Sequence, residues 1–423
     1  MIEMVIIADD LSGAADCGIA CTTAGYETLV VLGEREDEPE CRVLAVDADT
    51  RGRSPADAAA ESARLVRLHG TSGRILFRKL DSTLRGHVAT ELAATLATRR
   101  MLGPALIVLA PAFPAAGRTT RDGIQLLDGV PMEQTDIWRR ERMQGRAFLP
   151  EMMASADLRS ATIDLAAVRG DRLAGAMAAA ATTAVDVLCC DAESEDDLRL
   201  IAEAGAALGQ HVIWAGSAGL ARHVPDAVLK QQATSRSADA PVPAASGPIL
   251  FVIGSLSAVS ARQVALLAER PDVEHLLVPP VVLRAGAQAE GWRAIERALD
   301  AALATGHDVV VSLGAEPDAD PREGLVLCHA LASLTAPHAD RIGALVSAGG
   351  ETARAVLLAF RAAGLRLCGE IEPGVPLSLA EGWRQLPVVT KAGAFGSEQT
   401  FLRCRALLHA GYVPNRSRLE SDP

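Results

Sequence analysis

Residues 4–16 read MVIIADDLSGAAD, an apolar run followed directly by two carboxylates and then by small residues. Met4–Ala8 predicts a β-strand, and the residues after it predict a helix. Because a continuous apolar strand is typical of a parallel sheet covered on both faces, this stretch indicates α/β architecture. It also places Asp9 and Asp10 at the carboxyl end of the first strand, where open parallel sheets bind ligands.

The same alternation of apolar strands and Ala- and Leu-rich helices continues along the chain. Its 423 residues exceed one ordinary domain, and the pattern breaks at residues 231–247, QQATSRSADAPVPAASG, which have no usable period. We therefore predict two α/β domains, each with a largely parallel sheet flanked by helices, and a ligand site in the cleft between them. The predicted boundaries are 1–230, a linker at 231–246, and 247–423.

Composition excludes several classes of partner. Only 3% of residues are aromatic and the net charge is −12, with no long basic run, so neither nucleic acid nor an anionic membrane surface is expected as a partner. No apolar stretch reaches about 18 residues, and the opening residues do not resemble a secretion signal. The eight cysteines form no CxxC pair. We expect them to be reduced and buried in a cytoplasmic protein.

A second polar loop, residues 78–87, reads RKLDSTLRGH and also follows an apolar strand. Lys79 and Arg85 supply positive charge that suits a carboxylate. Asp81 and Ser82 can bind hydroxyls, and Gly86 lets a ligand approach the backbone. Such a set suits a small polyhydroxy acid. The alternative is a surface loop whose polar groups are satisfied by an Asp81–Arg85 ion pair within the loop itself. For Asp10 or Ser12, in the first stretch, the alternative is capping of the first helix.

Three further arginines lie near these loops. Arg51 follows the strand predicted at Val43–Val46, and Arg118 lies in the loop of residues 111–123, PAFPAAGRTTRDG, which its prolines and glycines predict to be stiff and non-helical. Both are candidates to bind an anion. Arg78 lies within a strand and is expected to face solvent.

The second domain has three glycine turns, each after an apolar strand: GSLS at 254–257, SAGGETA at 347–353 and KAGAFG at 391–396. Exposed amides at a helix N-terminus form a phosphate site, so three such turns favour a nucleotide. The chain has no GxxxxGK[ST] motif, and no GxGxxG follows its first strand. The turns therefore point to a less common nucleotide-binding fold.

Six stretches together resemble the four-carbon acid sugar kinase family, in the order of that family and over nearly the whole chain. They read IIADDLSGAADCG, RKLDSTLRGHVATEL, APAFPAAGRTTRDGIQLLDGVP, SAGGETARAVL, GEIEPGVPLSLAEG and TKAGAFGSEQTF. The resemblance implies a sugar-acid-binding N-terminal domain, a nucleotide-binding C-terminal domain and ATP-dependent phosphorylation of a terminal hydroxyl. Three positions depart from the usual pattern of the family: Ser12 replaces a Thr, Ala15 replaces an Asn, and Glu351 replaces an Asp.

The residue motifs and the resemblance lead to one hypothesis: in-line transfer from ATP, with Mg²⁺, to the 4-hydroxyl of a threonate- or erythronate-type acid. The alternatives are a kinase of 3-oxo-tetronate or a related oxo acid, and a non-enzymatic sensor of sugar acids. We also predict a possible homodimer. The predicted site residues are, for catalysis, Asp9, Asp10 and Asp81; for the substrate, Arg51, Lys79, Ser82, Arg85, Gly86 and Arg118; for the nucleotide, Ser255, Ser257, Gly349, Gly350, Glu351, Thr352, Gly393, Phe395 and Gly396; and for the metal, Glu351.

Overall fold

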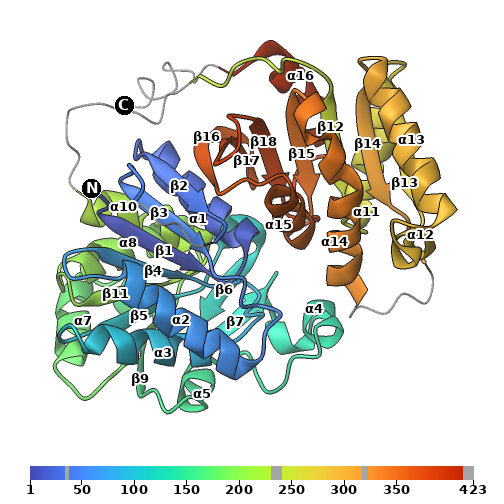
Figure 1. Ribbon diagram of the computed structural model, residues 1–423. Helices are drawn as coiled ribbons and strands as arrows, with labels where there is room; N and C mark the ends of the chain where they lie inside the picture. Colours follow the sequence, from blue (N-terminus) through green and yellow to red (C-terminus); the bar gives the residue numbers. More distant parts are fainter. Residues whose placement is uncertain (34–37, 230–240, 317–322, 413–423) are drawn as a thin grey trace. The chain divides into compact units, whose positions relative to one another are not determined.

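The computed structural model describes residues 1–33, 38–229, 241–316 and 323–412 (Figure 1). The described chain forms two compact units. Unit 1 comprises residues 1–28 and 38–229, and unit 2 comprises residues 29–33, 241–316 and 323–412. Residues 29–33, which the sequence assigns to the first domain, thus cluster with the second unit. The predicted linker at 231–246 lies mostly outside the described residues.

Unit 1 is built on a seven-stranded parallel sheet in the order β3-β1-β4-β11-β5-β10-β9. Helix α1 packs on β1 and β3, whereas α2 and α3 pack on each other. Figure 1 shows α2 and α3 together on one face of the sheet. The strands are β1 (Met4–Ala8), β3 (Val43–Asp47), β4 (Ile75–Lys79), β5 (Leu106–Ala110), β9 (Ser160–Ile163), β10 (Val187–Cys190) and β11 (Val212–Gly216), and the helices are α1 (Leu11–Thr23), α2 (Pro55–His69), α3 (Val88–Arg100), α4 (Asp136–Arg140), α5 (Leu149–Ala154), α6 (Leu165–Val168), α7 (Leu173–Ala181), α8 (Glu195–Ala206), α9 (Ala218–Ala221) and α10 (Val224–Val228).

A small antiparallel sheet of β6 (Arg118–Arg121), β7 (Ile124–Leu127) and β8 (Val130–Pro131) follows β5 in the chain. The prediction of a non-helical loop at 111–123 is therefore wrong in part. Pro114–Ala116 forms a turn of 3-10 helix, and Arg118 begins a strand.

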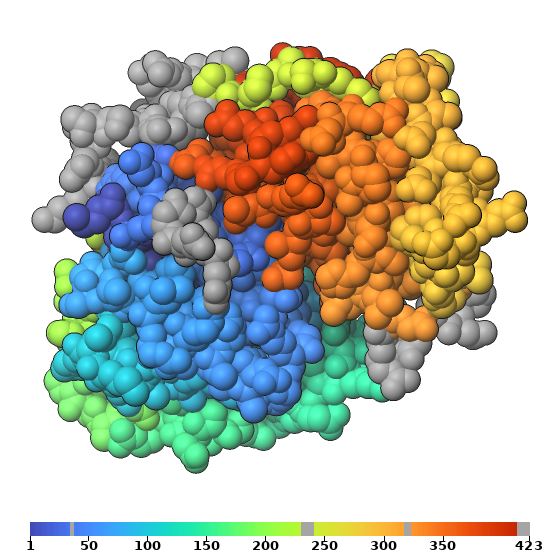
Figure 2. Space-filling model, in the orientation of Figure 1, coloured from blue at the N-terminus to red at the C-terminus, as the bar shows by residue number. Residues whose placement is uncertain are grey.

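Unit 2 has a mixed sheet in the order β13-β14-β12-β15-β18-β17-β16-β2. Its first five strands are parallel, and the last three run antiparallel to their neighbours. Helices α12 and α13, yellow in Figure 2, lie on the surface of this unit. The strands are β2 (Thr28–Val31), β12 (Ile249–Ile253), β13 (Val273–Val278), β14 (Asp308–Leu313), β15 (Ala344–Ala348), β16 (Gly364–Glu372), β17 (Val375–Glu381) and β18 (Pro387–Lys391), and the helices are α11 (Ala258–Ala268), α12 (Pro280–Ala285), α13 (Glu290–Ala304), α14 (Gly324–Thr335), α15 (Gly350–Ala359) and α16 (Thr400–Ala410).

Strands β1 and β12 are apolar along their whole length, as is typical of strands covered on both faces. All five residues of β1 and all five of β12 are buried. In unit 2, Phe251 of β12 meets Phe401 of α16 edge to face, with ring centroids 5.8 Å apart. All eight cysteines are buried free thiols, as predicted. Among the described residues, no helix is long and apolar enough to span a bilayer.

Candidate active site

The strand ends of unit 1 lie level with one another at the carboxyl edge of its sheet. Ala8 of β1 is in register with Asp47 of β3 and with Lys79 of β4, and Lys79 is in register with Gly216 of β11. The residues that follow these strands, Asp9 among them, therefore emerge along one edge.

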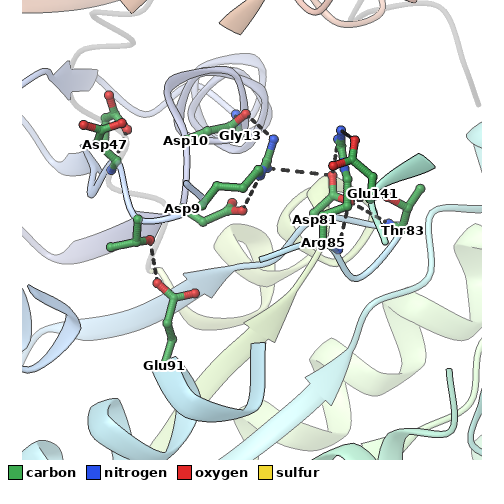
Figure 3. A network of polar contacts seen from close by, with 12 residues as sticks. Asp9, Asp10, Gly13, Asp47, Asp81, Thr83, Arg85, Glu91 and Glu141 are labelled. Carbon is green, nitrogen blue, oxygen red and sulfur yellow. Dashed lines mark hydrogen bonds and ion pairs between the residues drawn. The ribbon is translucent and has the colours of Figure 1, made fainter. Parts of the chain in front are cut away.

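Arg51 lies among three carboxylates at this edge. Its Nε donates to Asp9 Oδ2 and its Nη1 donates to Asp10 Oδ2, each at 2.7 Å (Figure 3). Its Nη2 lies 3.8 Å from Asp81 Oδ1. The structure thus brings together the three acids predicted for catalysis and one of the predicted cations.

Asp9 is buried, and among the described residues only its Oδ2 has a hydrogen-bond partner. Within the described part of the chain, Oδ1 makes no hydrogen bond, although it is shielded from solvent. Burial raises the pKa of Asp9, Arg51 acts to lower that pKa, and Asp10 raises it further. Asp9 therefore keeps a free, buried oxygen with an increased affinity for a proton.

Asp10 caps the first helix. Its Oδ1 accepts a hydrogen bond of 2.8 Å from Gly13 N, and its extended backbone is typical of an N-cap residue. Oδ1 of Asp10 therefore caps the helix, which is the alternative that the sequence left open for this residue, and Oδ2 binds Arg51. Both oxygens of Asp10 are occupied.

Asp81 is held by its own loop. Arg85 donates to it twice, from Nε and Nη2, each at 2.9 Å, and Thr83 Oγ1 also donates to it. Burial acts to raise the pKa of Asp81, but Arg85 first, and then Arg51 and Lys79, outweigh burial and lower it. The Asp81–Arg85 pair, the alternative weighed from the sequence, is formed, and it fixes Asp81 as an anion.

Lys79 is buried at the end of β4 and lies against the start of α1. A Cβ atom on Gly13 would be only 2.6 Å from Lys79 Nζ, so glycine is what lets the helix approach the ammonium group. Burial acts to lower the pKa of Lys79, but nearby Cys17, Asp9 and Asp10 outweigh it and raise the pKa. Lys79 is therefore a buried cation beside Asp9 and Asp10.

The other predicted substrate residues lie near this cluster. A Cβ on Gly86 would be 3.4 Å from Asp9 Oδ2. The carbonyl of Ser82 accepts a hydrogen bond of 2.9 Å from Gln125 Nε2 of β7. Arg118 Nη1 donates to Ala116 O at 2.6 Å, and its buried Nε has no partner among the described residues. Burial lowers the pKa of Arg118, whereas Asp81 acts to raise it.

Arg78 contradicts the expectation that it faces solvent. The side chain is fully buried and its Nη2 lies 3.2 Å from Glu91 Oε1 of α3. Neighbouring residues on a strand point to opposite faces, so Arg78 points away from Lys79.

In unit 2, the predicted glycine turns contact one another. Ser257 caps α11, and its Oγ donates to Gly393 O at 2.6 Å. A Cβ on Gly393 would be 2.1 Å from Ser255 Oγ, so this turn needs glycine to approach the first. Gly349 N donates to Lys391 O at 3.0 Å, which joins the second turn to the third.

The predicted nucleotide residues divide between two places within unit 2. Gly350, Glu351 and Thr352 form the first turn of α15, with Glu351 exposed and Thr352 buried. Phe395, by contrast, packs at the β16–β17 turn, where a Cβ on Gly374 would lie 2.3 Å from its ring, and Gly396 packs against Thr400.

The chain matches two families along its length. Residues 4–224 match the family described as a sugar-binding N-terminal domain, and residues 250–401 match a nucleotide-binding C-terminal domain. It is 42% identical to a D-threonate kinase from Cupriavidus necator, covering 99% of both chains, and 31% identical to a D-threonate kinase from Salmonella typhimurium, covering 96% of this chain and 98% of that one. The chain belongs to the four-carbon acid sugar kinase family.

Relatives named for other substrates are less similar. A D-erythronate kinase from Heliobacterium modesticaldum is 26% identical, and a 3-oxo-tetronate kinase from Pseudomonas fluorescens is 29% identical, each over 96% of this chain. The resemblance and the kinase class predicted from the sequence are confirmed.

The α/β fold is also confirmed by solved structures. A Salmonella typhimurium protein described as a putative tRNA synthase superposes with a TM-score of 0.80 at 22% identity, over 96% of this chain and 99% of that one. A Haemophilus influenzae protein superposes with a TM-score of 0.73 at 20% identity, over 96% of this chain and all of the other. At these identities the likeness concerns the fold alone.

One residue of this kinase escaped the sequence analysis. Lys391 ends β18, is buried, and donates from Nζ to Ser260 Oγ, Ala392 O and Gly393 O at 3.1–3.3 Å. Burial lowers its pKa to about 8. A compositional signal was available: only three of the 41 basic residues are lysines, and Lys79 and Lys391 both end strands at predicted sites.

Proposed function

We propose that this chain is an ATP-dependent kinase that phosphorylates the 4-hydroxyl of a four-carbon sugar acid, with D-threonate the favoured substrate. The observation that carries the proposal is the cluster in which Arg51 and Lys79 lie beside Asp9 and Asp10, with Asp9 and Lys79 buried and the other two half-buried. It offers cations for a carboxylate and oxygens for hydroxyls within one site. The 42% identity to a D-threonate kinase, over 99% of both chains, favours threonate over erythronate and 3-oxo-tetronate as the substrate.

The cations of unit 1 hold the substrate carboxylate. Arg51 has five N–H donors, of which Asp9 and Asp10 take two, so its guanidinium retains donors for a ligand. Lys79 adds a compact positive charge. Arg118, whose buried Nε has no partner in the described residues, supplies a further donor. Ser82 and Gly86 belong to the loop of residues 78–87, which also contains Lys79. Arg85 acts mainly on Asp81.

We assign the general base to Asp9. A base needs a free oxygen and a pKa shifted toward the operating pH. Asp10 uses both oxygens, as cap and as partner of Arg51, and Arg85 holds Asp81 as a weakly basic anion. Asp9 Oδ1 is free among the described residues, and its pKa is raised. Asp9 Oδ1 therefore accepts the proton of the attacking hydroxyl.

The turns of unit 2 bind ATP. Helix α15 begins at Gly350, and the amides of its first turn have no partner within the helix, which suits phosphate oxygens. The described residues hold no group of three or more His, Cys, Asp or Glu side chains placed to bind a metal. Magnesium in kinases takes one or two carboxylates together with substrate phosphates, so the exposed Glu351 fits as its single protein carboxylate. When bound, Mg²⁺ neutralises the charge that develops on the phosphates.

The test is release of ADP by the purified chain with ATP, Mg²⁺ and a panel of D- and L-threonate, D- and L-erythronate and 3-oxo-tetronate. We expect the highest kcat/KM with D-threonate. Highest activity with 3-oxo-tetronate would favour the alternative kinase. Absence of ADP release with every acid, while one acid still raises the melting temperature, would favour the sensor and overturn the proposal. The homodimer and the cytoplasmic location stay predictions.

A further inference from the structure

The strongest unexplained feature is a buried ion pair on the face of the unit 1 sheet opposite Lys79. Arg78 of β4 is 0% exposed and Glu91 of α3 is 2% exposed, and Nη2 lies 3.2 Å from Oε1. Within the described chain, none of the three guanidinium nitrogens of Arg78 makes a hydrogen bond of good geometry. A buried pair of this kind stabilises a fold no better than apolar residues of similar size, so stability alone does not explain it.

The ion pair places one oxygen of the Glu91 carboxylate against a loop of the candidate active site. Glu91 Oε1 accepts a hydrogen bond of 2.6 Å from Thr50 Oγ1 (Figure 3). Thr50 is fully buried and directly precedes Arg51. The hydrogen bond therefore fixes the residue next to the cation that joins Asp9 and Asp10.

Hydrogen bonds on both sides of Thr50 define the path of this loop. Asp49 has a φ of 50°, a left-handed conformation that aspartate tolerates better than most residues, and its N donates to Asp47 Oδ1 at 3.0 Å. On the other side, Thr50 N and Arg51 N both donate to Asp9 O, at 3.0 and 3.3 Å. Thr50 is thus held by its backbone to Asp9, which directly follows β1, and by its side chain to Glu91.

We propose that Arg78 and Glu91 are positioning residues that, through the Thr50 hydroxyl, set the placement of Arg51 and hence the affinity for the substrate carboxylate. The contact of 3.2 Å between Arg78 Nη2 and Glu91 Oε1 fixes the position of the oxygen that accepts from Thr50. This inference rests on the proposed function, because it assigns the substrate carboxylate to Arg51.

The chain offers a matched control for this inference. Ser62 Oγ donates to the same Glu91 Oε1, at 3.3 Å, but Ser62 lies within α2 and outside the loop that carries Arg51. Thr50→Val and Ser62→Ala each remove one hydroxyl from the same acceptor. Only the first releases the loop.

The experiment measures kcat and both KM values for wild type, Thr50→Val, Thr50→Ser and Ser62→Ala, with the melting temperature of each. We expect Thr50→Val to raise the KM for the sugar acid about tenfold, with the KM for ATP and kcat within about twofold of wild type, since uniform binding is lost. Thr50→Ser keeps the hydroxyl and should restore the KM. Ser62→Ala should change none of the three constants by more than about twofold.

Equal KM values for Thr50→Val and Ser62→Ala, or a parallel rise in both KM values of Thr50→Val, would overturn the inference while leaving the kinase intact. A wild-type chain that releases no ADP with any four-carbon acid would overturn the proposed function, and the inference with it.

Discussion

A single oxygen distinguishes the three carboxylates of the unit 1 site. Asp9 Oδ1 is buried without a partner among the described residues, whereas Asp10 and Asp81 are engaged on both oxygens. Asp9→Asn removes the base without changing the shape of the side chain, so we expect kcat to fall by about 10²–10⁴. Asp10→Asn is the control, because Asn also caps helices well, and it should lose less than about tenfold.

The pH profile gives a second readout of the same assignment. The base must be ionised, and burial raises the pKa of Asp9 above its ordinary 3.8. The rate should therefore fall, as pH decreases, with a midpoint above that value, and Asp9→Asn should lose this acidic limb. Equal losses in Asp9→Asn and Asp10→Asn, with the limb unchanged, would contradict the assignment.

Strand β18 ends in a buried ammonium group that ties together the turn after it. Burial holds the pKa of Lys391 at about 8, below its usual 10.5, so between these values the unfolded chain binds more protons than the folded chain. Stability rises with pH wherever that is so. We expect the free energy of unfolding of wild type, relative to Lys391→Met, to increase from pH 8 to pH 10. Urea titrations of both proteins at several pH values test this, and a constant difference would contradict it.

The sequence predicts the elements of the site whose signal is local. The strand at Met4–Ala8 has the predicted bounds because it is a short, continuous apolar run. The small antiparallel sheet of β6, β7 and β8 was missed because its first strand, Arg118–Arg121, reads RTTR and has no alternation of apolar and polar residues. The burial of Arg78 was missed because its partner, Glu91, lies 13 residues away on another element, and only the packing of α3 brings the two together.

At the scale of the whole molecule, one strand of unit 2 comes from the N-terminal part of the chain. Val31, Val30 and Leu29 of β2 pair antiparallel with Gly364, Leu365 and Arg366 of β16. The sequence of residues 28–32 does not predict which unit this strand joins, because an apolar strand has the same pattern in either sheet. The assignment depends on a partner more than 300 residues later in the chain.

This pairing predicts the behaviour of a truncated chain. Residues 241–423 alone lack β2 and leave an edge of β16 unpaired, so we expect them to aggregate. Fusing residues 26–33 ahead of residue 241 through a flexible linker should yield a folded monomer, whereas the same fusion with Val30→Asp should not, because Val30 is fully buried. Gel filtration and circular dichroism check the outcome. A folded monomer of residues 241–423 without the added strand would contradict the prediction.

The same pairing governs the order of events on the ribosome. Val31 is synthesised 333 residues before its partner Gly364, which at about 5–20 residues per second is a delay of about 17–67 s. The first unit is otherwise complete only once residue 229 has been synthesised, and over the remaining 135 residues, about 7–27 s, β2 still lacks its β16 partner. An apolar strand that waits for its partner is exposed to aggregation, so we expect faster translation of the residues after 229 to raise the yield of folded chain.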